Sequence, residues 1–244
     1  EQVMSVSNRI SEFNLRPGRM LTKKYEVLEL LGKGWEGEVY KISERSTGIE
    51  RAAKMFYPHR NPGDKTAKVY ARKLHKLRHC PMIIQYHNRE EIFFRRIAIT
   101  VLISEYVEGE RLCDFLNRQR GKRLTPFEAV HLLHTLACGI EQIHQLREYH
   151  GDLHTENIIV NHYGLDFELK LIDFYNWPSP KSENIQTDIV DMVRVFYDVL
   201  GGARHYAKQD RLVKDICCGL KQGLILKKFP TASHLIEHLE CMEW

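Results

Sequence analysis

The chain has 244 residues, 43% of them hydrophobic, and a net charge of +4. This length allows one substantial core or two small lobes that share a cleft. The charge is too mild to favour a nucleic-acid partner, and the basic clusters at residues 65–76 and 118–123 indicate a solvated helix face and a basic loop. No apolar run is long enough to cross a bilayer, and no secretory signal pattern opens the chain. Because the first residue is Glu1 rather than Met, we expect a trimmed N-terminus.

The cysteines form no C-x-x-C pair and show no metal-ligand spacing. We interpret them as reduced thiols that mostly fill the core of a cytoplasmic protein. A secreted effector that acts in a host cytosol is the alternative location. The six residues are Cys80, Cys113, Cys138, Cys217, Cys218 and Cys241.

From residue 25 to about residue 103 the patterns predict strands with one helix between them. Alternating or β-branched runs predict strands in "YEVLELL", "RAAKMFY" and "IAITVLISEYV". The segment "GDKTAKVYARKLHKLRH" has a helical composition and places Tyr70, Leu74 and Leu77 on one face. We therefore expect an N-terminal lobe built on a sheet.

After residue 109 the patterns become helical. "LTPFEAVHLLHTLACGIEQIHQL" opens with a capping box, in which Thr125 is the N-cap, Pro126 is the first helical residue and Glu128 reaches back. This predicts a helical C-terminal lobe and places a cleft near the junction at residues 105–109. The apolar residues expected on the inner face of the helix are Phe127, Val130, Leu133, Leu136, Ala137, Ile140 and Ile143.

The stretch "GKGWEGEV" has the pattern G-x-G-x-x-G-x-V, formed by Gly32, Gly34, Gly37 and Val39. Glycines let a turn approach an anion closely and present its backbone N–H groups. A dinucleotide-binding fold would need a helix directly after the glycines, but a strand follows here. The pattern therefore favours a glycine-rich lid over phosphates.

Lys54 lies in the predicted strand "AAKMF", where it could reach the same phosphates. Its apolar neighbours indicate a buried approach, and a buried ammonium needs an anionic partner. We therefore expect Lys54 to bind phosphate rather than to be an exposed surface lysine.

The stretch "HGDLHTEN" places Asp152 and Asn157 on a loop, because Gly151 and the strand "IIV" after it exclude a continuous helix. A carboxylate there can accept a hydroxyl proton, and the amide oxygen can bind Mg²⁺. "LKLIDF" ends a strand at Asp173, a second hard oxygen ligand, and "NHYG" is the expected hairpin turn between residues 158–160 and 168–172.

Zinc binding by the histidines of "HGDLH" is the alternative interpretation of this loop. His150 and His154 would need a helix and a third ligand, and the Gly-Asp pair between them opposes that helix. A core or loop role for His154 is therefore preferred over metal binding.

In this order the motifs resemble the protein kinase superfamily from residue 25 to the C-terminus, and the opening "RPGRMLTKKYEVLELLGKG" resembles bacterial serine/threonine kinases. The resemblance implies an α+β, two-lobed fold: an extension at 1–24, an N-terminal antiparallel sheet lobe with one helix at 25–107 and a mainly helical lobe at 108–244. It implies ATP and Mg²⁺ as cofactors and a protein substrate. The implied roles are phosphate binding by Lys54 and the glycines, catalysis by Asp152, metal binding by Asn157 and Asp173, a gatekeeper at Ser104, adenine contacts at Glu105 and Val107, and bracing of the catalytic loop by Asp188.

Three departures from the family pattern affect the activation segment and the residues that contact it. Gly151 replaces the arginine that reads a phosphate on the activation segment, and the segment shrinks to "YNWPSPKSENIQT" with no Ala-Pro-Glu. Phe229 replaces the arginine that pairs with that missing glutamate. Because the catalytic groups all survive, the resemblance implies a constitutive enzyme.

Two further departures concern the catalytic groups themselves. The helix that carries the glutamate partner of Lys54 in the family has Tyr70 at the aligned place, and residues 64–89 contain no Glu. We therefore expect Lys54 to pair with Asp173 or with the nucleotide alone. Tyr175 replaces the glycine after Asp-Phe, which restricts the backbone there.

Three functions fit these patterns. A protein serine/threonine kinase without activation-loop regulation ranks first. "HGDLH" also resembles the aminoglycoside and choline phosphotransferases, so a small-molecule phosphotransferase ranks second, although the short lower lobe lacks an insertion to enclose a small molecule. A nucleotide-binding pseudokinase scaffold ranks third.

Overall fold

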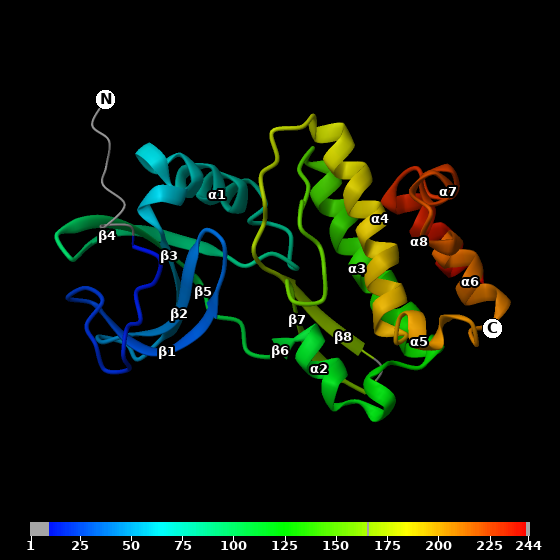
Figure 1. Cartoon of the computed structure of the whole chain (residues 1–244), viewed down its shortest axis with the longest axis horizontal. Helices are drawn as coiled ribbons and strands as arrows, with labels where there is room; N and C mark the ends of the chain where they lie inside the picture. The colour runs from blue at the N-terminus through cyan, green and yellow to red at the C-terminus, as the bar shows by residue number, and fades with distance from the viewer. Residues whose placement is uncertain (1–9, 165, 243–244) are drawn as a thin grey trace. The chain divides into compact units, whose positions relative to one another are not determined.

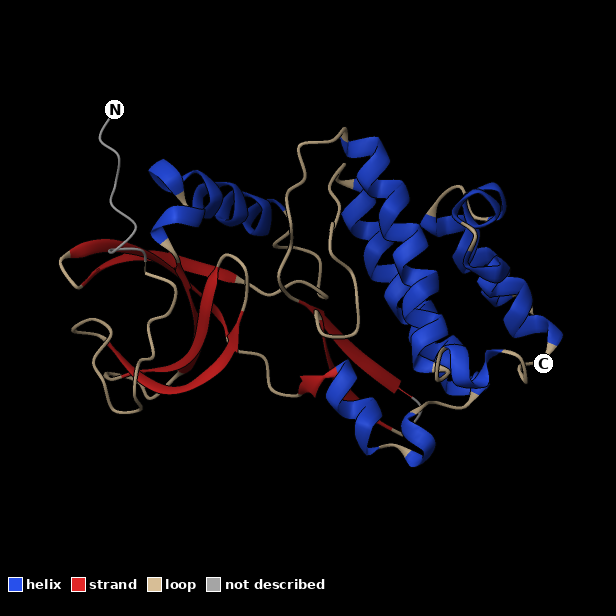
Figure 2. Ribbon diagram, viewed as in Figure 1, coloured by secondary structure: helices blue, strands red, loops and turns tan. Residues whose placement is uncertain are grey.

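The computed structural model describes residues 10–164 and 166–242. The described residues divide into two compact units. The first unit comprises residues up to 78 together with residues 84–106, and the second comprises residues 79–83 and the chain from residue 107 onward. Figure 1 labels the elements of each unit, and Figure 2 separates helices from strands.

The first unit is an antiparallel sheet of five strands accompanied by one long helix, which confirms the predicted architecture of this part. The strand order is β1-β2-β3-β5-β4. Alternating residues of the inner strands, such as Tyr40, Ile42, Ala53 and Met55, are fully buried, as expected for one face of a packed sheet. The elements are β1 (Tyr25–Lys33), β2 (Gly37–Glu44), β3 (Glu50–Phe56), α1 (Lys65–Lys76), β4 (Tyr86–Phe94) and β5 (Ile97–Glu105).

Residues 10–24 belong to the same core as the sheet. Phe13 packs against the rings of Tyr57 and Phe94, each with ring centroids 5.3 Å apart. The Phe13 N–H donates to the buried carboxylate of Glu38 (3.1 Å), which also accepts from the hydroxyl of Tyr57 (3.2 Å). Because these bonds satisfy a carboxylate that has no contact with water, the segment before β1 helps to stabilise the sheet.

Helix α1 presents Tyr70, Leu74 and Leu77 to the interior, as its spacing predicts. Its basic residues are exposed with one exception, because Lys73 is buried. The expected solvated face therefore holds for most of the cluster at residues 65–76.

The second unit is mainly helical and contains a small three-stranded sheet of order β6-β7-β8. Helices α3 and α4 lie side by side along much of their length (Figure 1). None of the helices in the described part of the chain is long and apolar enough to cross a membrane. The elements are β6 (Glu110–Arg111), α2 (Leu112–Arg118), α3 (Pro126–Gln145), β7 (Ile158–Tyr163), β8 (Asp166–Leu171), α4 (Lys181–Val199), α5 (Ala203–Tyr206), α6 (Arg211–Cys217), α7 (Gln222–Lys228) and α8 (Ala232–Glu240).

The predicted start of α3 is confirmed, and one of its predicted core residues is not. The Thr125 hydroxyl accepts from the Glu128 N–H (3.3 Å), and the Glu128 carboxylate accepts from the Thr125 N–H (2.8 Å). Phe127 is 45% exposed and packs edge-on against His131 instead of entering the core. It lies in the first turn, where helical spacing alone does not decide which side has a neighbour to pack against.

Two further expectations need correction. The hairpin turn is shorter than predicted, because Asn161 and His162 pair with Glu168 and Phe167 inside the ladder. The cysteines are all free, but only Cys80 and Cys217 are buried, so most of them do not fill the core.

Candidate active site

The glycine-rich segment forms the turn between β1 and β2. The N–H of Gly34 donates to the carbonyl of Gly37 (2.9 Å). A Cβ atom on Gly37 would lie 1.8 Å from the carbonyl oxygen of Met55, so only glycine allows this approach to β3. The turn is therefore held against the strand that carries Lys54.

The predicted nucleotide-binding residues of β1, β2 and β3 lie in register. Val39 is paired with Gly32 on one side and with Lys54 on the other. The strand pairing thus brings together residues that are far apart in the sequence, as the glycine-lid prediction requires.

Lys54 has a carboxylate partner that the sequence analysis did not predict. Its Nζ atom lies 2.9 Å from Oε2 of Glu36, inside the glycine-rich turn. The ammonium also lies 4.4 Å from the centroid of the Tyr70 ring, at the place where the family has its glutamate. Glu36 was visible in "GKGWEGEV", but a pattern of glycines does not show which way the side chain between them points.

The predicted adenine-contacting residues occur at the end of β5 and directly after it. Ser104 is buried and pairs with Ala52 of β3. The N–H of Glu105 donates to the carbonyl of Gln85 (2.8 Å), and its carboxylate accepts from the Gln85 N–H (3.0 Å). These two bonds fix the end of β5, and Val107 begins the second unit.

In the second unit, two hydrogen bonds position the His150 imidazole. Its Nδ1 accepts from the N–H of Asp152 (3.2 Å), which assigns the tautomer in which Nε2 donates to the carbonyl of Ile172 (2.9 Å). Its ring also packs against Phe174, with centroids 4.5 Å apart. The histidine thereby joins the loop at Asp152 to the segment that follows β8.

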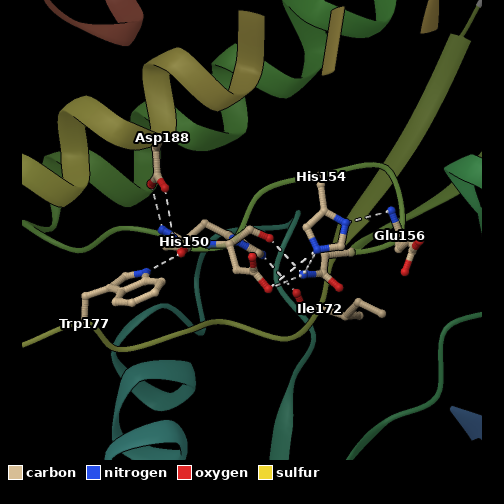
Figure 3. A network of polar contacts seen from close by, with 9 residues as sticks. His150, His154, Glu156, Ile172, Trp177 and Asp188 are labelled. Carbon is tan, nitrogen blue, oxygen red and sulfur yellow. Dashed lines mark hydrogen bonds and ion pairs between the residues drawn. The ribbon is translucent and has the colours of Figure 1, made fainter. Parts of the chain in front are cut away.

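Asp188 braces this loop from α4, in the role that the resemblance implied. Its carboxylate points toward the loop in Figure 3 and accepts from the consecutive N–H groups of His150 (2.7 Å) and Gly151 (2.9 Å). His144 of α3 lies 3.1 Å from the same carboxylate. A fully buried carboxylate needs such partners, so the two helices and the loop are tied to one point.

The structure brings Asp152 and Asn157 together. The buried Asn157 donates from Nδ2 to the carbonyl of Asp152 (2.8 Å) and to its carboxylate (3.1 Å). His154 lies 3.0 Å from the same amide and 3.6 Å from the Asp152 carboxylate. The Asp152 side chain is 52% exposed, so its carboxylate is both held by a neighbour and open to an incoming hydroxyl group.

Asp173 lies two residues beyond the end of β8 and has φ of +56°, in the left-handed region. Few non-glycine residues adopt this conformation, and aspartate does so more readily than most. The Ile172 N–H donates to the carbonyl of Asn157 (3.0 Å), so one backbone hydrogen bond joins Asn157 to the residue before Asp173.

The segment after Asp173 is shorter than predicted. Helix α4 begins at Lys181, so most of the residues expected in a shortened activation segment are helical. The Trp177 indole N–H donates to the carbonyl of Gly151 (2.6 Å; Figure 3). The Tyr175 N–H donates to the carbonyl of His150 (3.0 Å). The remaining residues of the segment are thus held directly against the loop of Asp152.

A cavity of about 570 Å³ opens beside Asp152. Three of its lining residues are acidic, and Arg194 forms an ion pair with one of them, Asp191 (3.0 Å). Burial raises the pKa of Asp191 to about 6, and the charges of Asp188 and Asp152 act in the same direction against the opposing effect of Arg194. The lining residues are Gly151, Asp152, Leu153, His154, Trp177, Ser179, Asn184, Thr187, Asp191, Arg194, Val195 and Asp198.

Comparison with known proteins supports the assignment that the motifs suggest. The protein kinase domain family matches residues 25–187, which is more than half of the chain. The chain belongs to the protein kinase family. It is 29% identical to mouse cyclin-dependent kinase 15 over 97% of this chain and 55% of the relative, and 32% identical to human myosin light chain kinase 3 over 62% of this chain and 18% of the relative. The chain therefore spans about half the length of the first relative and about a fifth of the second.

Among solved structures, the kinase domain of PknI from Mycobacterium tuberculosis is similar, with a TM-score of 0.65 and 17% identity over 93% of this chain and 98% of that domain. At this identity the likeness shows the fold alone. Together these matches confirm the α+β kinase fold and the kinase family. Members of this family use ATP with a divalent metal.

Proposed function

We propose that this chain is an ATP-dependent protein serine/threonine kinase that transfers the γ-phosphoryl group of Mg·ATP to a protein hydroxyl. The observation that carries the proposal is the pairing of Asp152 with Asn157 on a loop braced by Asp188. A structural loop has no need to hold a half-exposed carboxylate beside a buried amide. A phosphotransferase needs that carboxylate at the acceptor and the amide at the metal.

The residues fit a magnesium site. Carboxylate and amide oxygens suit Mg²⁺, which proteins bind through one or two such ligands together with substrate phosphates. In the described part of the chain, no three His, Cys, Asp or Glu side chains gather as a metal site. Asp173 and Asn157 would therefore hold the ion jointly with the nucleotide. When bound, Mg²⁺ neutralises charge on the phosphates.

The chain's own residues account for the other steps. Lys54 and the turn of Gly32, Gly34 and Gly37 hold the phosphates, while the end of β5 contacts adenine. Asp152 orients the acceptor hydroxyl and accepts its proton as the phosphoryl group is transferred. Contacts within each unit hold these groups before the reaction, so positioning and electrostatic stabilisation supply the rate enhancement.

We also propose that the enzyme is active without phosphorylation of its activation segment. Residues 173–180 are held by the loop of Asp152 through the contacts of Tyr175 and Trp177. A segment that is already held in this way needs no phosphate to order it.

The test is phosphoryl transfer by the purified chain with Mg·ATP, read as autophosphorylation and as labelling of a mixed protein substrate. Asp152→Asn should lower the rate by at least about 100-fold, the lower end expected for loss of a general base. The matched control is Glu156→Gln, an exposed carboxylate on the same loop, which should keep full activity. Transfer to small alcohols without protein labelling would favour the small-molecule alternative, and no transfer at all would favour a scaffold.

A further inference from the structure

We infer that Glu36 is the positioning residue of Lys54 and takes the place of the glutamate that helix α1 lacks. This inference rests on the proposed function, because the lysine needs positioning only if it binds phosphate. In kinases the strand lysine must be held by a carboxylate for transfer to proceed. Helix α1 cannot supply that carboxylate, since it contains no Asp or Glu and its aligned residue is Tyr70.

The geometry of the pair supports this role. The Nζ of Lys54 and Oε2 of Glu36 are 2.9 Å apart, the distance of a charge-assisted hydrogen bond. The two side chains are only 12% and 17% exposed, so solvent screens the pair far less than it screens a surface ion pair.

The turn that carries Glu36 is anchored on both sides of this residue. The N–H of Tyr57 donates to the Glu36 carbonyl (2.9 Å), which ties the turn to the end of β3. The guanidinium of Arg60 stacks 3.0 Å from the Trp35 ring, and the absence of a side chain at Gly37 allows the close approach to β3. A carboxylate on so fixed a turn can hold an ammonium in one place, which a carboxylate on a loose lid could not.

Tyr70 adds an aromatic face to the environment of the ammonium. Its ring lies 4.4 Å from Nζ and packs edge-on against Phe56, with centroids 6.4 Å apart. The face of an aromatic ring attracts a cation without carrying a full negative charge. Tyr70 therefore supports Lys54 from the side of α1, while Glu36 supplies a full negative charge from the turn.

Because Glu36 lies on the phosphate-binding turn, kinetics can distinguish positioning of Lys54 from a purely structural role in holding the turn. A carboxylate on the phosphate-binding turn repels the nucleotide phosphates, so removal of its charge should not weaken ATP binding on electrostatic grounds. Loss of Lys54 positioning should instead slow the transfer step. The expected signature is a lower kcat with an unchanged or lower KM for ATP.

The first measurement needs no enzymatic activity. Competitive acylation with acetic anhydride, read by peptide mass spectrometry, reports how strongly each lysine ammonium is stabilised. The reagent attacks only the neutral amine, and a neighbouring carboxylate favours the charged ammonium, so a paired lysine is labelled more slowly. Glu36→Gln should raise labelling of Lys54 severalfold and leave Lys41 unchanged. The matched control is Glu50→Gln, which breaks the 2.9 Å ion pair of Lys41 on neighbouring strands and should raise labelling of Lys41 alone.

The second measurement is the kinetics of ATP turnover. Glu36→Gln should lower kcat by about 10- to 100-fold, the range for one charge-assisted contact, and Glu50→Gln should not change it. Equal loss of kcat and of ATP affinity would mean that Glu36 only holds the turn, and a faster variant would mean that it competes with phosphate; either result overturns the inference. A wild-type chain without turnover refutes the proposed kinase function, while unchanged Lys54 labelling in Glu36→Gln refutes the pairing itself.

Discussion

A Cβ atom on Gly151 would lie 2.7 Å from the carbonyl oxygen of Tyr175. It would also lie 2.9 Å from the ring of Tyr149, and Gly151 has φ of +88°, which L side chains rarely adopt. The position therefore has no room for the arginine found there in the family pattern. The absence of that arginine and the close packing of the short segment against the loop are therefore linked, because a side chain at residue 151 would clash with this packing.

The first prediction concerns this packing. Gly151→Ala should lower the free energy of unfolding by about 2–4 kcal/mol, because backbone strain adds to a clash with main-chain atoms. Gly48→Ala is the matched control: Gly48 has φ of +73°, but a Cβ atom placed on it would have no other atom within 4 Å, so the variant should lose only about 1 kcal/mol. Urea denaturation measures both, and equal losses would show that the segment moves freely away from the loop.

The second prediction concerns regulation. Phosphatase treatment should leave the rate of phosphoryl transfer essentially unchanged, because Gly151 cannot read a phosphate. The candidate acceptors already have intramolecular bonds: the Ser179 hydroxyl donates to Asn184 (3.0 Å) and the Thr187 hydroxyl to the carbonyl of Glu183 (3.0 Å). A large loss of activity after dephosphorylation would reveal a regulatory site, and Ser182 would be the next residue to test.

The third prediction concerns the metal. Asp173→Ala should abolish Mg²⁺-dependent ATP turnover and the Mg²⁺-dependent part of the thermal stabilisation by ATP, because it removes the carboxylate ligand. Glu168→Gln, an exposed carboxylate on β8 close in sequence, should keep both. The metal assignment fails if Asp173→Ala retains full activity.

Features that depend on nearby residues were predictable from the sequence. The capping box of Thr125 and Glu128 closes within one helical turn, so its residue types determine its bonds. The loop of Asp152 and Asn157 followed from a glycine and from the strand after it. Long-range strand pairing was also implied, because the glycine pattern and Lys54 must meet if both bind phosphates.

Features that depend on the path of a turn were not predictable. The direction of the Glu36 side chain is set by the anchoring of its backbone to Tyr57, which no pattern reveals. Likewise the early start of α4 depends on Asn184, whose amide donates to the carbonyls of Ser179 and Pro180 (both 3.1 Å) and so stabilises the first turn. Family resemblance placed the recognisable part of that helix later, around Asp188.

The fourth prediction concerns pH and the cavity beside Asp152. The pKa of Asp191 is raised, chiefly by burial, from 3.8 to about 6. Because the folded pKa exceeds the unfolded one, the contribution of Asp191 to stability is complete below about pH 4 and is lost as pH rises through about 6. A shift of about two units corresponds to at most about 3 kcal/mol, and partial solvent access and Arg194 reduce it.

Asp191→Asn should remove this pH dependence. Relative to the variant, the wild type should lose about 1–3 kcal/mol of unfolding free energy between pH 4 and pH 7, as measured by urea denaturation at several pH values. A difference between the two proteins that stays constant over this range would show that Asp191 remains ionised in the folded state.

The last prediction uses Lys54 to test whether the chain is an enzyme or a scaffold. Lys54→Met should slow phosphoryl transfer at least tens-fold, about the 2 kcal/mol expected for one lost charge-assisted contact. The fold should survive, because Glu36 keeps some access to water and lies on a turn rather than in the core. Lys41→Met, which removes the 2.9 Å ion pair between Lys41 of β2 and Glu50 of β3, is the control for loss of an ion pair as such and should leave transfer unchanged. If the wild-type chain transfers no phosphoryl group to any acceptor and Lys54→Met keeps its effect in cells, binding rather than catalysis is its task, and the carboxylate of Glu36 then serves to hold the turn closed.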